Sequence, residues 1–164
     1  MIEVSDLSES EIREVLGRVG YGHLACSREN LPYVVPVHYA YDEGSIFIFT
    51  TEGKKFEIIN ENPHVCLQVE DITDNQHWIS VIVDGVAAQI PNGPEHDRAL
   101  ELIIKVNPTL TPAVSIRWMD NWVRENIEVV YRITPTATSG RRSINRLGDK
   151  PFVPQSKEAK DRII

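Results

Sequence analysis

The chain has 164 residues, of which 41% are hydrophobic and 25% are charged, and its formal net charge is −7 at pH 7. This size and balance are typical of one soluble globular domain, and they exclude a disordered or fibrous chain. The acidic balance argues against general nucleic-acid binding, and every apolar run is far shorter than the roughly 20 residues that cross a bilayer, so we expect a cytoplasmic protein with no nucleic-acid or membrane partner.

The first part of the chain predicts a short helix followed by an antiparallel meander. Ser8 and Glu11 match a capping box, and apolar residues then recur at helical spacing until Gly17. Three β-rich segments separated by turn-forming residues predict strands over residues 22–26, 33–41 and 46–50. Residues 54–62 predict a helix that ends at Pro63, which cannot donate a backbone hydrogen bond.

The second part of the chain adds strands and one more helix. Alternating apolar residues predict further strands over residues 64–70, 78–90 and 127–134. Gly85 interrupts the long strand as a bulge or barrel bend, and Pro94 fits the first turn of a helix that ends near Asn107. Six short strands with few helices predict a mainly β protein, a six-stranded antiparallel barrel over residues 1–135. Residues 136–164 are expected to form a basic polar tail, either solvated or partly ordered on the barrel.

One junction concentrates groups that suit a phosphate. Two hydroxyls, of Thr50 and Thr51, and two ammonium groups, of Lys54 and Lys55, flank Gly53 where a strand gives way to a helix. The unpaired N–H groups and partial positive charge of a helix N-terminus would add to them. The pattern alone equally allows threonines that cap the helix and lysines that are merely solvated.

The remaining reactive side chains follow no recognised catalytic pattern. Cys26 and Cys66 lie in apolar stretches and are expected to be free thiols, and the five histidines share no metal-ligand spacing. His38 could move a proton or could point away from a site, because successive side chains of a strand face opposite sides. Trp78 and Trp118 are either core or interface residues or ring partners of a ligand. The sequence therefore predicts no metal site and identifies no catalytic residue.

Several short motifs occur in a characteristic order. They are residues 17–20 (GRVG), 32–37 (PYVVPV), 47–50 (FIFT), 53–55 (GKK), 62–66 (NPHVC) and 78–85 (WISVIVDG). Together their order and spacing resemble the pyridoxamine 5′-phosphate oxidase-like FMN-binding split-barrel family, especially its nitroimidazole-resistance branch.

The resemblance implies a set of FMN contacts. Backbone groups along the isoalloxazine ring would come from Val35, Pro36 and Val37. Groups at the phosphate would come from Thr50, Thr51, Lys54 and Lys55. Contacts to the ring would come from Ser80 and, on the second protomer, from Trp118. Trp78 is a further candidate for ring contact, chosen for its aromatic side chain and not implied by the resemblance. The apolar segment 112–123 is the expected wall of a homodimer.

The resemblance implies an FMN-dependent oxidoreductase that reduces nitro compounds or another small acceptor. Oxidation of pyridoxamine phosphate is not expected, because Lys54 and Lys55 stand where the vitamin B6-forming oxidases have Arg-Lys. Two alternatives remain open at this stage: a non-catalytic carrier or sensor of flavin, and a haem or deazaflavin binder on the same fold.

Overall fold

The computed structural model describes residues 3–107 and 128–144. In chain order, its elements are β1 (Glu3–Asp6), α1 (Glu9–Val19), β2 (Tyr21–Arg28), β3 (Leu31–His38), β4 (Ala40–Asp42), β5 (Ser45–Thr51), α2 (Lys54–Glu61), β6 (His64–Asp74), β7 (His77–Gln89), α3 (Pro94–Val106) and β8 (Glu128–Ile144). The capping box predicted at Ser8 is present at the start of α1. No helix within the described ranges has the length and apolar character needed to cross a membrane.

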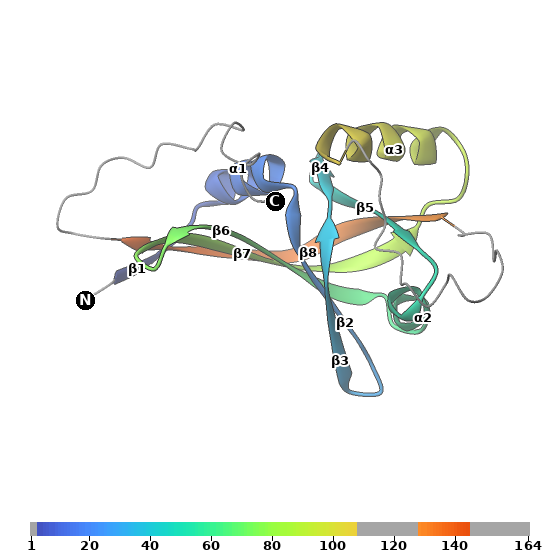
Figure 1. Cartoon of the computed structure of the whole chain (residues 1–164), viewed down its shortest axis with the longest axis horizontal. Coiled ribbons are helices and arrows are strands. Elements are labelled where there is room, and N and C mark those ends of the chain that lie inside the picture. The colour runs from blue at the N-terminus through green and yellow to red at the C-terminus, as the bar shows by residue number, and fades with distance from the viewer. Residues whose placement is uncertain (1–2, 108–127, 145–164) are drawn as a thin grey trace, which may run out of the picture.

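The strands form a single antiparallel sheet that curls without closing. Its order is β3-β2-β6-β7-β8-β5-β4, and β1 pairs with the far end of β8. The two edge strands, β3 and β4, are consecutive in the chain and separated only by Tyr39, but they do not pair with each other. Figure 1 shows the β2–β3 hairpin projecting from the body, with α1 and α3 above the long strands and α2 beside the end of the sheet. This arrangement is the split barrel that the sequence predicted.

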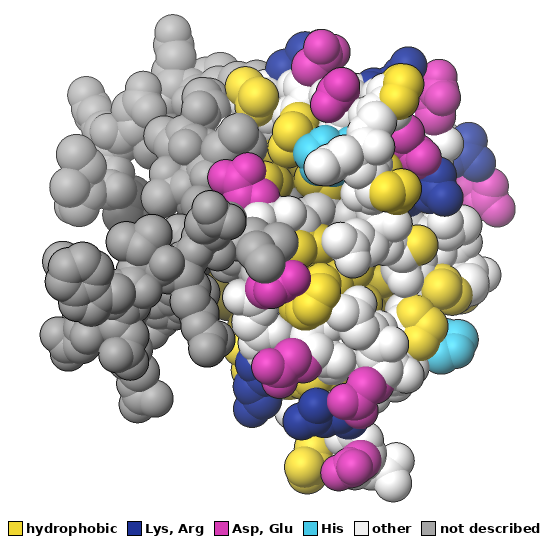
Figure 2. All heavy atoms as spheres, turned by 90° about the vertical axis from the view of Figure 1, so that its right-hand side faces the viewer, with side chains coloured by type: hydrophobic (Ala, Val, Ile, Leu, Met, Phe, Trp, Pro, Cys, Tyr) yellow, Lys and Arg dark blue, Asp and Glu magenta, His cyan; other side chains and the backbone are white. Residues whose placement is uncertain are grey.

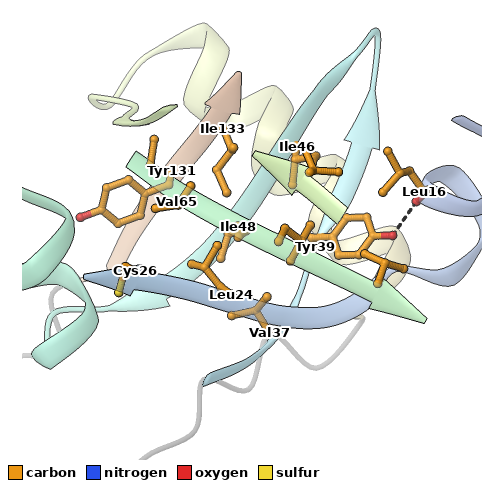
Figure 3. Close-up of a cluster of buried hydrophobic side chains, with 14 of the residues drawn as sticks. Leu16, Leu24, Cys26, Val37, Tyr39, Ile46, Ile48, Val65, Tyr131 and Ile133 are labelled. Carbon is orange, nitrogen blue, oxygen red and sulfur yellow. Dashed lines mark hydrogen bonds between the residues drawn. The ribbon is translucent and has the colours of Figure 1, made fainter. Parts of the chain in front are cut away.

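The side chains of the curled sheet form one large interior cluster, which we call the barrel core. Tyr39 is completely buried in it, and its hydroxyl donates a hydrogen bond of 2.9 Å to the Leu16 carbonyl oxygen of α1 (Figure 3). A second, smaller cluster lies under α3, where Ile103 packs with Phe47 and Val130. Alternation along β5 explains the division, because Ile46 and Ile48 belong to the barrel core whereas Phe47 belongs to the cluster under α3.

Gly85 lies at an irregularity in β7, as predicted. The register with β8 shifts between Asp84 and Gly85. A Cβ atom on Gly85 would lie 2.7 Å from a methyl carbon of Ile133 and 2.8 Å from the backbone oxygen of Thr134. The bulge therefore allows β7 to bend closely against β8.

The structure differs from the prediction in the number and length of strands. β1 was not predicted, and the strand expected over residues 33–41 divides into β3 and β4 at Tyr39. The last strand continues to Ile144, so residues 136–144 pair within the sheet and extend the strand expected over 127–134. Most side chains of this extension are exposed, and its charge is matched locally by Asp6, which lies 3.5 Å from Arg141. A strand that is polar on both faces has no regular alternation of apolar and polar residues, so the sequence of this extension does not predict a strand. Residues 145–164 lie outside the described ranges.

Candidate functional site

The junction between β5 and α2 is where the predicted phosphate-binding groups meet. Thr50 is the last inward-facing residue of β5 and is only 6% exposed, and its hydroxyl makes a long hydrogen bond of 3.4 Å to the Thr51 carbonyl oxygen. Gly53 is the N-cap of α2, and no side chain within the described ranges caps this helix. The interpretation of the threonines as helix caps is therefore wrong. The first N–H groups of α2 lack a side-chain acceptor, which leaves them suited to an anion.

Helix α2 is held firmly against the barrel. Ile58 and Ile59 are buried, and the ring of Phe56 lies 6.4 Å from the ring of Tyr131 on β8. At the other end of the helix, the Asn62 side-chain amide donates to the Ser27 carbonyl oxygen at 2.9 Å. The helix N-terminus consequently has a fixed position relative to β2 and β5.

The two lysines occupy the first turn of α2, and each has a different environment. Lys54 is exposed, and its Nζ lies 4.8 Å from the centre of the Tyr33 ring on β3. Lys55 is half-buried, and burial lowers its pKa, while the nearby Cys26 thiol of β2 has the opposite, smaller effect. Figure 3 shows Cys26 and Tyr131 at the end of the barrel core that adjoins this helix.

Neither lysine is neutralised by a carboxylate of the residues that the structure describes. Of the ion pairs between described residues, none includes Lys54 or Lys55. The positive end of the helix dipole repels cations, so two lysines here are electrostatically unfavourable in the protein alone. Figure 2 shows acidic and basic side chains interspersed over the end of the molecule that it presents, so positive charge is not spread widely over the part of this end that is visible. The attraction for an anion is therefore local to this junction.

Strand β3 provides an open edge beside the junction. It pairs with β2 and with no other strand among the described residues, so half of its backbone groups have no ladder partner. Val37 is buried and Val35 half-buried, whereas Pro36 is exposed on the opposite face. His38 shares the outer face with Pro36, and its ring lies 5.4 Å from the Tyr21 ring. Of the two orientations considered for His38, the structure shows the one directed away from Val35 and Val37.

Two of the other predicted contacts lie far from the junction within one chain. Ala87 marks the end of β7 nearest α2, because its amide donates to the Pro63 carbonyl oxygen at 2.9 Å. Ser80 lies seven residues earlier on the strand, which is about 23 Å at roughly 3.3 Å per residue. Trp78 lies farther still, and its amide donates to the Ser143 hydroxyl at 3.0 Å. Both side chains are half-buried, and their ring contacts stay predictions. Trp118 and the segment 112–123 lie outside the described residues.

Tyr33 and Cys26 are the residues that sequence reasoning did not assign to the junction. They face each other across the β2–β3 ladder, and both lie close to the first turn of α2. The alternation of Tyr33 with Val35 and Val37 predicts that all three share a face, but only the packing of α2 brings Lys54 onto the Tyr33 ring. Within the described ranges, no group of three or more histidines, cysteines or acidic residues is placed to hold a metal ion.

Comparison with known proteins agrees with this architecture. A family model described as pyridoxamine 5′-phosphate oxidase matches residues 8–142. An uncharacterized protein of Rhizobium meliloti is 33% identical over 94 residues, which are 56% of this chain, and the match spans only 62% of that relative's length.

Two solved structures have the same fold. The crystal structure of an FAD-binding protein from Mesorhizobium loti is 32% identical, with a TM-score of 0.75 over 88% of this chain and 100% of that one. A candidate 5-nitroimidazole antibiotic resistance protein from Bacteroides thetaiotaomicron is 17% identical, with a TM-score of 0.65 over 88% of this chain and 93% of that one. The second likeness concerns the fold alone.

Proposed function

Because this chain belongs to the pyridoxamine 5′-phosphate oxidase family, we propose that it binds a flavin whose phosphate lies at the N-terminus of α2. The observation that carries the proposal is the pair of lysines in the first turn of that helix, which no carboxylate of the described residues neutralises. The FAD-binding protein of Mesorhizobium loti, at 32% identity, supports a flavin as the ligand.

The residues present fit a phosphate in three respects. The N–H groups at the start of α2 have no side-chain cap, and a Cβ atom on Gly53 would meet nothing within 4 Å, so the approach is open among the described residues. Lys54 and Lys55 supply positive charge, and Thr50 and Thr51, at the end of β5, precede them closely in the chain. Each of these groups favours a bound anion, and a phosphate would remove the repulsion between the lysines and the helix dipole.

Among phosphorylated flavins, we propose that FMN is preferred to FAD. The phosphate monoester of FMN carries a charge of about −1.5 to −2 at neutral pH. In FAD the same phosphate is joined to riboflavin by an ester bond and to the AMP phosphate by an anhydride bond, so it carries a single negative charge. Two adjacent ammonium groups are better matched by the monoester, although the open surroundings of Gly53 do not sterically exclude a longer ligand.

The proposed activity is that of a flavin-dependent oxidoreductase acting on a small acceptor, with nitro compounds as the suggested class. Bound FMN would supply hydride or electron transfer, and the protein would supply binding and orientation. The open edge of β3, with the backbone of Val35, Pro36 and Val37, is suited to lie along the ring. Lys54 and Lys55 would hold the phosphate. The site is proposed to be completed by a second copy of the chain, in the cytoplasm.

The test of the cofactor is calorimetric titration of the purified protein with FMN, FAD and riboflavin. We expect FMN to bind more tightly than FAD, and riboflavin to bind more weakly than FMN because it lacks the phosphate. Equal affinity for FMN and FAD would contradict the FMN preference, and failure to bind any flavin would overturn the proposed function.

An absorption spectrum then separates the functional alternatives. A flavin gives a yellow protein, and anaerobic bleaching by NADH or NADPH supports an oxidoreductase. A yellow protein that neither nicotinamide reduces would favour a flavin carrier or sensor. A Soret band would instead indicate haem bound on the same fold.

A further inference from the structure

The side chain of Lys54 does not extend away into solvent, although its position at the start of a helix would favour this. It is exposed at the first position of α2, beside a second lysine and at the positive end of the helix. The positive end of the helix dipole repels its charge, and this favours a lysine side chain that extends into solvent. Instead, its Nζ lies 4.8 Å from the centre of the Tyr33 ring. A cation over the face of an aromatic ring is attracted by the ring's electron density.

Tyr33 is a fixed support for this contact. It is half-buried, packs against the barrel core and pairs in register with the buried Cys26 of β2. The ring therefore belongs to β3, the strand proposed to lie along the flavin, while the ammonium group belongs to α2, the helix proposed to hold the phosphate. The Tyr33–Lys54 contact joins these two parts of the site.

From this geometry we infer that Tyr33 is a positioning residue that holds Lys54 at the phosphate end and so adds to the preference for FMN over riboflavin. The inference rests on the proposed flavin site. An ammonium group has three N–H donors, and the ring face engages only one side of it. The remaining donors stay available to phosphate oxygens, and the side-chain ordering is already in place before the ligand arrives. Riboflavin has no phosphate and gains nothing from this arrangement.

The test compares Tyr33→Leu with Tyr33→Phe, each measured for FMN and for riboflavin by calorimetry. Tyr33→Leu keeps an apolar side chain but removes the aromatic face, and we expect it to weaken FMN binding by about 2–5-fold without changing the affinity for riboflavin. Tyr33→Phe keeps the face and should bind both ligands as the wild type does. Urea unfolding of both variants establishes that they are folded.

A double-mutant cycle with Lys54→Ala assigns the effect to the contact. In the Lys54→Ala background, Tyr33→Leu should no longer change the affinity for FMN. An effect that persists there, or a loss that is equal for FMN and riboflavin, would overturn the inference and make Tyr33 a purely structural residue. A wild-type protein that binds no flavin would instead overturn the proposed function.

A measurement without ligand tests the contact itself. In NMR spectra of the wild type and of Tyr33→Phe, the ε-methylene protons of Lys54 should be shifted upfield by the ring, and this shift should vanish in Tyr33→Leu. Lys105, in the last turn of α3, serves as the reference lysine. Identical Lys54 shifts in all three proteins would contradict the positioning role whether or not a flavin binds.

Discussion

At the scale of single residues, the lysines of α2 differ in how much each should contribute to binding. Lys55 is half-buried beside Cys26 and has little water around it, whereas Lys54 is exposed. A charge-assisted hydrogen bond is stronger where water is excluded, because the protein interior screens charge less than water does. The half-buried lysine should therefore matter more to a bound phosphate than the exposed one.

We predict that Lys55→Ala weakens FMN binding by about 1.5–3 kcal/mol, the usual worth of a charged hydrogen bond, and that Lys54→Ala weakens it less. Calorimetry with riboflavin provides the ligand control, because its affinity should hardly change. Lys105→Ala, a substitution in the last turn of α3, is the matched protein control. Equal losses for FMN and riboflavin would mean that the lysines support the fold rather than the phosphate.

Buried tyrosines give the protein a defined response to alkaline pH. Burial, which is the larger cause, and the neighbouring Glu52 together raise the pKa of Tyr131 from 10.0 to about 12. Below pH 10 the folded and unfolded chains both hold this proton. Between about pH 10 and 12, the unfolded chain releases the proton while the folded chain still retains it.

The free energy of unfolding should consequently fall as pH rises from about 10 to about 12. In Tyr131→Phe this fall should be shallower, because one of the titrating groups is gone. Urea unfolding at a series of pH values measures the slope. A variant with the same slope as the wild type would contradict the assignment to Tyr131.

At the scale of elements, Tyr39 connects the two edges of the sheet with helix α1. Its amide donates to the Gly20 carbonyl oxygen at 3.1 Å, and its hydroxyl donates to the Leu16 carbonyl oxygen at 2.9 Å. The chain crosses here from β3 to β4 without pairing them. In a closed barrel, pairing would hold the two edge strands in place. Here the two hydrogen bonds of Tyr39 fix the crossing between these strands to α1 and its C-cap.

We expect Tyr39→Phe to lower the free energy of unfolding by about 1–3 kcal/mol, because it leaves the buried Leu16 carbonyl oxygen without this donor. Tyr41→Phe is the matched control, since Tyr41 is half-buried on β4 and its hydroxyl makes no hydrogen bond to another described residue. Urea unfolding monitors both. Similar stability losses in the two variants would show that the loss in Tyr39→Phe does not come from the hydrogen bond to Leu16.

The ladder between β2 and β6 depends on the absence of a side chain at Gly22. A Cβ atom there would lie 2.5 Å from the backbone oxygen of Gln68 and 3.2 Å from side-chain carbons of Leu67 and Val69. A backbone oxygen in a paired strand cannot move without separating the strands. The sequence offers no sign of this requirement, because a glycine in a strand also fits a bulge.

Gly22→Ala should therefore destabilise the protein by roughly 1–3 kcal/mol, as overpacking does. Gly53→Ala is the control, since a Cβ atom there meets nothing within 4 Å and its φ of 176° is an extended conformation open to any residue. Thermal unfolding of the flavin-free proteins gives the comparison. A stable Gly22→Ala protein would mean that β2 and β6 separate more easily than their register implies.

At the scale of the whole molecule, we propose the β2–β3 hairpin, among the described elements, as a surface for a second copy of the chain. Leu31 is 70% exposed, Val34 is 58% exposed and Tyr21 is 42% exposed. The hairpin projects from the body, and its outer strand is an unprotected edge among the described strands (Figure 1). Exposed apolar side chains on an open edge favour association. In a two-fold dimer, each copy would cover the open side of the flavin site of the other.

We predict that the FMN-loaded protein is a homodimer of two 18.6 kDa chains, and that Val34→Lys shifts it toward monomer while weakening FMN binding. Light scattering at several dilutions, combined with calorimetry, tests both effects. Val4→Lys, at a valine 50% exposed on β1, is the matched control and should leave both unchanged. A stable monomer that retains FMN would show that one chain builds the site alone.

The sequence by itself determined most of the local structure and the chemistry of the junction. Strand alternation, turn residues and the prolines placed six segments of the sheet and the helices, because these signals depend on neighbours along the chain. The group of Thr50, Thr51, Lys54 and Lys55 was also recognisable, because its members are close in sequence and lie in one strand-to-helix turn.

Only the tertiary structure decided which distant residues meet. β1 and the extension of β8 are polar and gain their strand form from pairing with each other and with β7. The approach of Tyr33 and Cys26 to the lysines arises from the packing of α2 against the β2–β3 ladder, and the separation of Ser80 from this junction follows from the direction of β7. Such contacts join residues far apart in the chain, and their energies come from burial and register, which no local pattern of residues encodes.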